Sequence, residues 1–471
     1  MPTPPTAYEP YSSQQRERRE KNDKMALPGS DPFITLPSEL CVQIFAMTGS
    51  LWTASRVIKA SPVMLRQYLG NKMHVIRDII QYDQDMMQDA MGILLFPCVS
   101  SPEQGLLYDR PATVIRSHIR KWSKSQLPDP LKKKNDLVIS QLCKLHSRIM
   151  LLTEDYITKA TAFFPPREYL CLPQVQDLSE RHLFFKGDKV TALSNFTNLT
   201  TLERKRFVKA FLMYYLMAKI NHLGQLPRRV PQRKVSKAEE EAVYCVVSYV
   251  KTLYGSMFAQ CADAWLPTTS SVNSPESGLL YPDNFDFDAN VYALDMKLDD
   301  HTRFFYSHDF GSDFERLGPD RLFDFLRHDL SKEDERQGLK AKLQIAAQWE
   351  CEHRCHDVYD TLDVFFEPDK DYKDGHESSM YEHLSVELNI DSDSGSPAWK
   401  LCTQRAWVFF DDNRFYPQGT KKRPTFPSDD FLRKQSRRTQ YNWDKTRALR
   451  RSQQWHEGII VHIDTDQIDR L

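Results

Sequence analysis

Glycine and long apolar runs are both scarce in this 471-residue chain. Only 16 residues are glycine against 27 prolines, which favours helices separated by rigid loops over sheets joined by tight turns. The longest apolar runs, such as 211–218, fall well short of the roughly 20 residues that a membrane-spanning helix needs. The N-terminus also lacks the apolar core of a secretory signal. We therefore expect a mainly α protein with no membrane partner, located in the cytoplasm and/or the nucleus.

The charge and cysteine patterns exclude further classes of protein. The formal net charge is −1, so no global field steers the chain towards nucleic acid or an anionic membrane. The nine cysteines are an odd number without a repeated spacing, which is typical of buried thiols in a reducing compartment rather than of a disulfide framework. These features agree with a cytoplasmic or nuclear protein.

The motifs of common catalytic sites are absent from the sequence. There is no glycine-rich phosphate loop, no G-x-S-x-G elbow and no H-E-x-x-H pair, each of which supplies a specific catalytic geometry. With 14 histidines and many acids, a chance polar triad would carry little information. We therefore predict that the protein is not an enzyme, with no catalytic residue and no cofactor; an unrecognised enzyme remains the least favoured alternative.

Two short segments have part of a metal-binding pattern. Cys351 and Cys355 are four residues apart on a predicted helix, with His356 and Asp360 nearby. A structural zinc site normally takes four ligands from two separated pairs, and no second pair follows, so we predict no metal. The segment that begins at Asp286 resembles a calcium loop only at its start, because its later positions lack the required glycine and glutamate.

The chain is organised around residues 36–69. Pro37 and Ser38 are typical of a helix start, and a second helix is predicted from Leu51. Because the residue before a proline is pushed out of the helical region, Ser61 ends that helix and Pro62 begins a third. The sequence therefore predicts three short helices and no strand between residues 36 and 69.

The apolar spacing predicts which side chains of this stretch are buried. Leu40, Ile44 and Met47 recur at helical intervals, and Phe45 widens the stripe. Such a stripe normally faces the core. We therefore expect Leu40, Ile44, Phe45 and Val57 to be largely shielded from solvent.

The order of residues here is similar to that of the F-box, the module that docks on the Skp1 adaptor. The resemblance rests on Leu36-Pro37-x-Glu39-Leu40-x-x-x-Ile44-Phe45 followed by Leu51 and Val57. Ala60-Ser61-Pro62 is similar to the ending of many F-box-like proteins of filamentous fungi. Thr48 departs from the pattern, which has an apolar residue there, and a buried hydroxyl would need a hydrogen-bond partner.

The resemblance implies a partner and a set of contact residues. The implied Skp1-binding residues are Leu36, Pro37, Glu39, Leu40, Ile44, Phe45, Leu51 and Val57. Among them, the start of the unit should supply much of the binding energy and stay partly exposed, namely Leu36, Pro37, Ile44 and Phe45. The chain would then be the substrate-recognition adaptor of an SCF-type (Skp1–cullin–F-box) E3 ubiquitin ligase. Two alternatives stay open besides an enzyme: a regulatory or scaffold protein outside a ligase, and an ordinary helical subdomain.

The rest of the chain divides by composition. Residues 1–30 are proline-rich and then charged, which predicts a disordered tail, and 31–72 are the F-box-like domain. Residues 73–398 predict an irregular helical domain that would bind an unknown target protein, with a long helix over 73–95. Residues 399–471 form a C-terminal region with short strands, for which 399–410 and 459–463 are aromatic or β-branched candidates. No repeat period is present, which argues against a leucine-rich or propeller-type target domain.

Charge is segregated in the last third of the chain. Residues 350–393 are strongly acidic and 421–451 are basic. A basic segment with interspersed aromatic residues is one signature of nucleic-acid binding. Because the net charge is close to zero, we expect the two blocks to be solvated or to screen each other, and nucleic acid is an unlikely partner.

Overall fold

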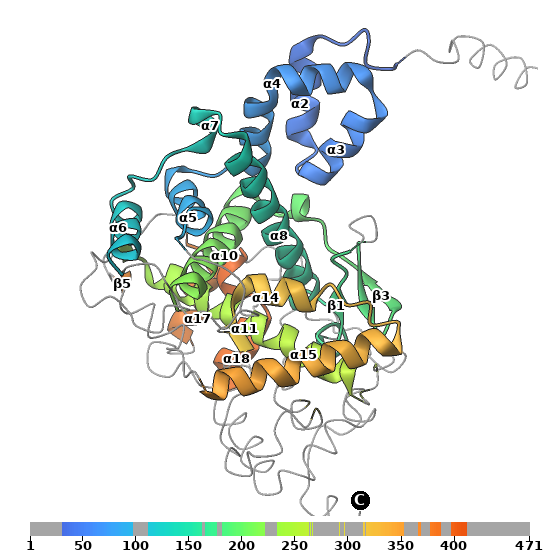
Figure 1. The fold of residues 1–471 in the computed structure, drawn as a ribbon, viewed down its shortest axis with the longest axis vertical. Coiled ribbons are helices and arrows are strands. Elements are labelled where there is room, and N and C mark those ends of the chain that lie inside the picture. Colours follow the sequence, from blue (N-terminus) through green and yellow to red (C-terminus); the bar gives the residue numbers. More distant parts are fainter. Residues whose placement is uncertain are drawn as a thin grey trace, which may run out of the picture. The chain divides into compact units, whose positions relative to one another are not determined.

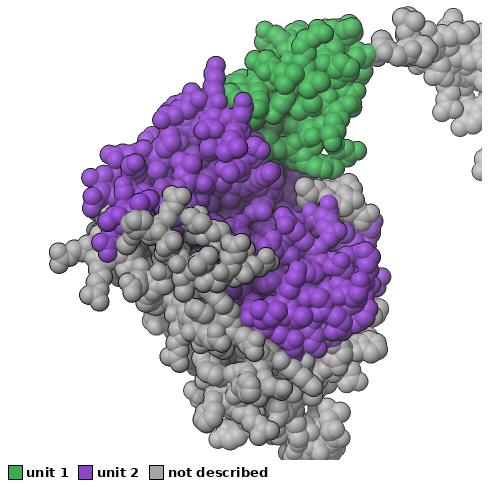
Figure 2. Space-filling view, viewed as in Figure 1, with its two compact units in different colours: residues 1–81 green, residues 82–471 purple. Residues whose placement is uncertain are grey.

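The computed structural model divides the chain into two compact units, residues 1–81 and 82–471 (Figure 2). We call them unit 1 and unit 2. The structure describes residues 31–97, 112–162, 165–176, 181–221, 233–262, 264, 266, 292, 296, 314–315, 317–352, 366–368, 377–387 and 397–411. The fold is mainly helical with a few short strands, which confirms the predicted fold class. The predicted tail 1–30, the basic segment 421–451 and the strand candidate 459–463 lie outside the described residues.

The described part of unit 1 contains three helices, α2 (Ser38–Met47), α3 (Leu51–Ala60) and α4 (Pro62–Ile80). Two serines cap the second and third of them. The Ser50 hydroxyl accepts a hydrogen bond from the Thr53 amide at 3.5 Å, and the Ser61 hydroxyl accepts one from the Met64 amide at 3.0 Å. Such caps satisfy amides that have no partner within the helix. The three helices predicted within residues 36–69 are confirmed, with no strand among them.

The third helix is longer than the sequence suggested. Helix α4 continues to Ile80, with non-helical backbone angles at Asn71. It ends where Gln81 adopts a left-handed conformation, and the Asp83 carboxylate then caps α5 (Gln84–Leu94), accepting from the Met86 amide at 2.9 Å. The prediction of one helix over 73–95 is therefore wrong. The predicted domain boundary after residue 72 falls inside α4, and the boundary between the units follows Gln81 instead.

Unit 2 is built around long helices. Helix α10 (Thr201–Asn221) packs against α5, α8 (Asp136–Ala160) and α11 (Lys237–Cys261), as Figure 1 shows. Capping boxes begin α10 and α11, each with a reciprocal pair of side chain-to-amide hydrogen bonds. This is the arrangement that a Ser/Thr-x-x-Glu pattern specifies.

Shorter helices complete the described part of unit 2. They are α6 (Ala112–Ser123), α7 (Pro130–Lys133), α9 (Pro165–Glu168), α14 (Gly318–Phe325), α15 (Glu333–Glu352), α17 (Ser379–Glu387), α18 (Pro397–Gln404) and the 3-10 helices η2 (Phe196–Asn198) and η5 (Trp407–Phe409). Within the described helices, none is long and apolar enough to cross a membrane.

The strands lie mainly in the middle of the chain. An antiparallel sheet has the order β1 (Leu172–Pro173), β2 (His182–Phe185), β3 (Asp188–Ala192), and β4 (Arg233–Val235) pairs in parallel with β5 (Phe366–Pro368). Lys186 and Gly187 turn between β2 and β3 with φ of 49° and 94°, as two-residue hairpins require. A Cβ at Gly187 would lie 2.4 Å from Ser331 Cβ, so only glycine fits there.

The strand predicted over 399–410 is wrong, because this segment forms α18 and η5. Its aromatic residues fill the core of unit 2, where the Phe207 and Phe409 rings stack at 4.0 Å. Both α18 and η5 pack against α11, in the same unit. A short apolar run has the same composition in a buried strand and in a buried helix.

Candidate functional site

Asp31 attaches the segment before α2 to the start of α4. Its carboxylate accepts hydrogen bonds from the Ser61 hydroxyl at 2.6 Å, the Val63 amide at 3.2 Å and the Phe33 amide at 3.0 Å. The bond from Ser61, together with the amide bonds, lowers the pKa of Asp31. This anchor positions the residues at which the F-box-like pattern begins.

The core of unit 1 consists of Cys41, Phe45, Ala54, Met64, Val75 and Ile79. The Phe45 ring meets Tyr68 edge to face at 5.8 Å. Partly buried apolar side chains surround this centre, namely Phe33, Leu36, Val42, Ile44, Leu51, Val57, Ile58 and Tyr68. All three helices therefore contribute to one small core.

Helix α2 has two apolar faces, and only one of them is buried. Cys41 and Phe45 are fully shielded, whereas Leu40 is 44% exposed and Met47 is 83% exposed. Ile44 lies between the two faces and is half-buried. We call Leu40, Ile44 and Met47 the outer stripe of α2. The expected shielding of Phe45 is confirmed, that of Leu40 is wrong, and Val57 is half-buried.

The physical reason is the size of the unit. In so small a domain, α3 and α4 can cover only about one face of α2. Cys41 and Phe45 lie on that face. The aromatic side chain of Phe45 buries the larger apolar area. Leu40 and Met47 therefore remain in solvent, although they belong to the spacing that predicted a core face.

Exposed apolar side chains are concentrated in unit 1. Nine large apolar residues are exposed in the described part of the chain, and five of them belong to unit 1: Ile34, Leu40, Met47, Leu65 and Leu69. Unit 2 supplies most of the described residues yet has only four. A concentration of exposed apolar groups commonly marks a site of protein interaction.

The other residues of the F-box-like pattern are divided between surface and core. Pro37 is exposed at the N-cap position of α2, and Glu39 is exposed in its first turn. Leu36, Leu51 and Val57 are half-buried and pack on the core. Phe45 has no exposed surface, so the expectation that it stays partly exposed for docking is wrong.

Four exposed residues were not among those expected from the sequence to bind a partner, namely Ile34, Met47, Leu65 and Leu69. Met47 belongs to the helical spacing that predicts a stripe facing the core. The alternative spacing of Cys41 and Phe45, four residues apart on the next row of the helix, was the available signal.

Thr48 and Gly49 make the turn between α2 and α3. The Thr48 hydroxyl donates to the Phe45 carbonyl at 2.7 Å, so its hydroxyl is satisfied within unit 1. Gly49 follows with φ of 59°, a conformation that glycine adopts without strain. The polar residue at position 48 is therefore compatible with the three-helix arrangement.

A buried polar network in unit 2 is the arrangement closest to a catalytic site. Lys159 Nζ lies 2.9 Å from the Asp155 carboxylate, which also accepts from the Tyr249 hydroxyl at 2.5 Å. Burial raises the pKa of Asp155, while the Lys159 ammonium opposes this shift. Both side chains are fully shielded, and the Tyr169 and Tyr249 rings lie 6.0 and 5.8 Å from the ammonium.

This network lies outside two recesses in the described part of unit 2. A groove of about 580 Å³ lies elsewhere in unit 2, beside α6, and a smaller cavity of about 30 Å³ lies at Lys205, Ser236 and Glu377. Asp155, Lys159 and Tyr249 line neither of them. The network connects α8 to α11 through the hydrogen bond from Tyr249 to Asp155.

Metal binding has no support within the described part of the chain. There, no group of three or more histidine, cysteine, aspartate or glutamate side chains is placed to hold an ion. The side chains of Cys351 and Cys355 and the segment at Asp286 lie outside the described residues, so those predictions remain predictions. No protein family, curated protein or solved structure matches the chain.

Proposed function

We propose that the chain is a substrate-recognition adaptor of an SCF-type ubiquitin ligase. Unit 1 docks on a Skp1-like adaptor protein, and unit 2 holds a target protein for ubiquitination by other subunits. The observation that carries the proposal is the outer stripe of α2, an exposed apolar helix face directly after the Leu36-Pro37 start of the F-box-like pattern. The proposal locates the protein in the cytoplasm or the nucleus, where such ligases act.

The proposal divides the contact residues by role and adds Met47 to those that the resemblance implies. Leu36, Pro37, Leu40, Ile44 and Met47 are exposed or half-buried along the start and outer stripe of α2, so they meet the adaptor. Phe45 acts from the core, because it positions the outer stripe without touching a partner. A Phe45→Ala change removes core packing, typically at about 3–5 kcal/mol, and therefore tests folding rather than docking.

The discriminating variant replaces exposed residues only. In Leu40→Asp with Met47→Asp, two apolar contacts become charges, and burying an unpaired carboxylate at an interface is costly. Truncating one central apolar anchor costs about 2 kcal/mol or more, close to thirtyfold in affinity. We expect the double variant to weaken binding to a purified Skp1-like protein by at least about thirtyfold, measured by isothermal titration calorimetry.

Leu137→Asp is the matched control. Leu137 is 71% exposed near the start of α8 in unit 2, so this change has the same chemistry outside the proposed docking surface. Its affinity should equal that of the wild type, and all three proteins should have the same circular dichroism spectrum. If the wild type binds no Skp1-like protein, or the double variant binds as tightly as the wild type, docking through α2 is wrong. Binding to Skp1 without recruitment of a cullin would favour the scaffold alternative.

A further inference from the structure

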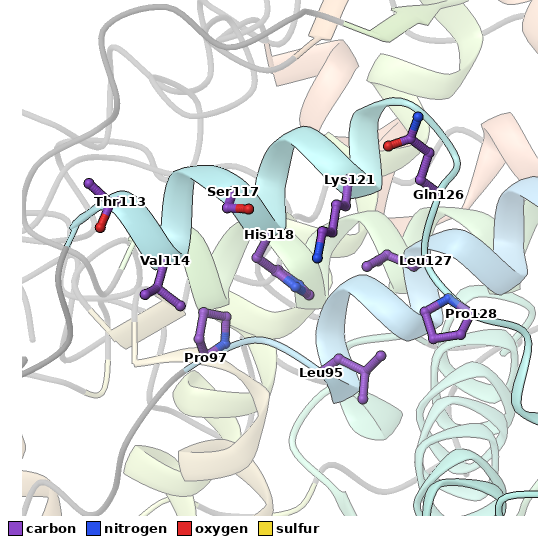
Figure 3. Close-up of a pocket in the computed structure, with 10 residues that line it drawn as sticks. All are labelled: Leu95, Pro97, Thr113, Val114, Ser117, His118, Lys121, Gln126, Leu127 and Pro128. Atoms are coloured by element: carbon purple, nitrogen blue, oxygen red, sulfur yellow. The ribbon is translucent and has the colours of Figure 1, made fainter.

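A groove in unit 2 runs along α6 (Figure 3). Val114, His118 and Lys121 line it from α6, and Leu95, Pro97 and Pro128 line it from the end of α5 and the loop after α6. The groove has a volume of about 580 Å³. Its lining combines apolar side chains with polar ones, most of which come from α6.

Buried hydrogen bonds hold the walls of this groove in place. The Gln88 side-chain amide donates to the Leu127 carbonyl at 3.0 Å and accepts from the Leu127 amide at 2.9 Å. His118 Nε2 lies 2.9 Å from the Gly92 carbonyl, which connects α6 to α5. A recess whose walls are fixed in this way is preorganised, which reduces the entropic cost of binding.

The charged residues of helix α6 are all basic. Helix α6 exposes Arg116, Arg120 and Lys121 and contains no acidic residue, and Lys124 is exposed directly after its last residue. Arg116 and Arg120 lie one turn apart on the same face of the helix, and Lys121 lines the groove itself. Asp89, which lies beneath α6, is buried and bound to Arg233 and to the Trp122 indole nitrogen. Asp89 is therefore already paired with Arg233.

We propose that this groove binds an acidic, extended peptide segment of another protein, with apolar side chains against the apolar lining residues and carboxylates against the α6 cations. Charge complementarity selects such a partner and accelerates its association. The identification of this peptide as part of the ligase target rests on the proposed function. Peptide binding itself does not require unit 1. A single-stranded nucleic acid fits less well, because it needs stacking platforms and His118 is the one aromatic ring among the residues that line the groove.

The test uses the purified full chain and a fluorescein-labelled pool of peptides about 12 residues long. Each peptide has fixed Asp and Glu positions around two positions randomised among Leu, Ile, Met and Phe. We expect saturable binding by fluorescence polarisation, weakened as salt rises. Lys121→Glu should weaken it about tenfold, and a pool with Lys in place of the acids should bind this variant more tightly than it binds the wild type.

Lys342→Glu is the control, because Lys342 is exposed on α15 and undergoes the same charge change. It should keep the wild-type affinity within about twofold. Val114→Asp is a second groove variant that leaves every α6 cation in place, and it should also bind more weakly. No binding of the acidic pool, equal effects of the Lys121 and Lys342 changes, or tighter Lys121-dependent binding of a poly(dT) oligonucleotide would each overturn the proposal. This peptide-binding assay contains no Skp1-like protein. Its failure can therefore be distinguished from failure of adaptor docking.

Discussion

Single side chains decide how the start of unit 1 is built. Asp31 shows this most clearly, since one carboxylate accepts from Ser61, Phe33 and Val63. Ser61 in turn caps α4, so a side chain 30 residues earlier in the chain stabilises the start of the third helix. The placement of Leu36 and Pro37 at the proposed docking surface depends on this local network of hydrogen bonds.

We predict that the Asp31 carboxyl titrates below 3.8, its ordinary value. Because the folded pKa is lowered, the ionised carboxylate stabilises the fold above the unfolded pKa, and this contribution is lost as the pH falls through the folded pKa. Carboxyl-carbon NMR titration measures it directly. Ser61→Ala should return the pKa of Asp31 towards 3.8, because the hydroxyl bond is the largest cause of the shift. A pKa at or above 3.8 in the wild type would contradict the hydrogen-bond geometry.

At the scale of elements, close packing at Gly92 holds α5, α6 and α10 together. A Cβ at Gly92 would lie 3.1 Å from Trp122 Cδ1 and 3.2 Å from Leu216 Cδ1. The neighbouring ring atom of Trp122, Nε1, donates a hydrogen bond to Asp89 at 2.8 Å, so the ring cannot move away freely. The groove beside α6 therefore depends on a glycine in the middle of a neighbouring helix.

Gly92→Ala should lower the free energy of unfolding of unit 2 by about 1–3 kcal/mol, because overpacking costs this much in a filled core. The control is Gly338→Ala in α15, where nothing lies within 4 Å of the added Cβ. That change should stabilise the protein by about 0.5–1 kcal/mol, since alanine is the better helix former. Urea denaturation measures both changes. Equal effects of the two substitutions would show that packing at Gly92 is not tight.

At the scale of the whole molecule, each unit has its own core. That of unit 1 is centred on Phe45. The core of unit 2 contains the stacked rings of Tyr156 and Tyr249, 4.4 Å apart, beside the buried Asp155–Lys159 pair. Removing one partner of a buried ion pair leaves the other charge without compensation in a medium of low polarity.

We expect Lys159→Met to destabilise unit 2 by about 3–5 kcal/mol and to leave unit 1 folded. Hydrogen–deuterium exchange should accelerate in peptides from α8, α10 and α11 and stay unchanged in those from α2 and α3. Lys342→Met, at an exposed position of α15, is the control and should change stability by no more than about 0.5 kcal/mol. Faster exchange in α2 and α3 would show that the two units unfold together.

The sequence was most informative where structure depends on neighbouring residues. Three signals each act within a few residues: the Ser61-Pro62 pair, the capping pattern at Ser236 and Glu239, and the break at Gly49 and Ser50. Their outcome could therefore be predicted. The end of α4 at Gln81 could not, because a left-handed glutamine has no distinctive sequence signal.

The sequence by itself determined the mainly helical class, the three helices of unit 1 and their starting residues, because caps and prolines act locally. Only the tertiary structure decided that α2 buries Cys41 and Phe45 and exposes Leu40 and Met47. It also decided that residues 397–409 are helical and pack against α11. Burial and pairing depend on which distant elements arrive at a surface, and an apolar pattern is the same whether its partner is the chain's own core or another protein.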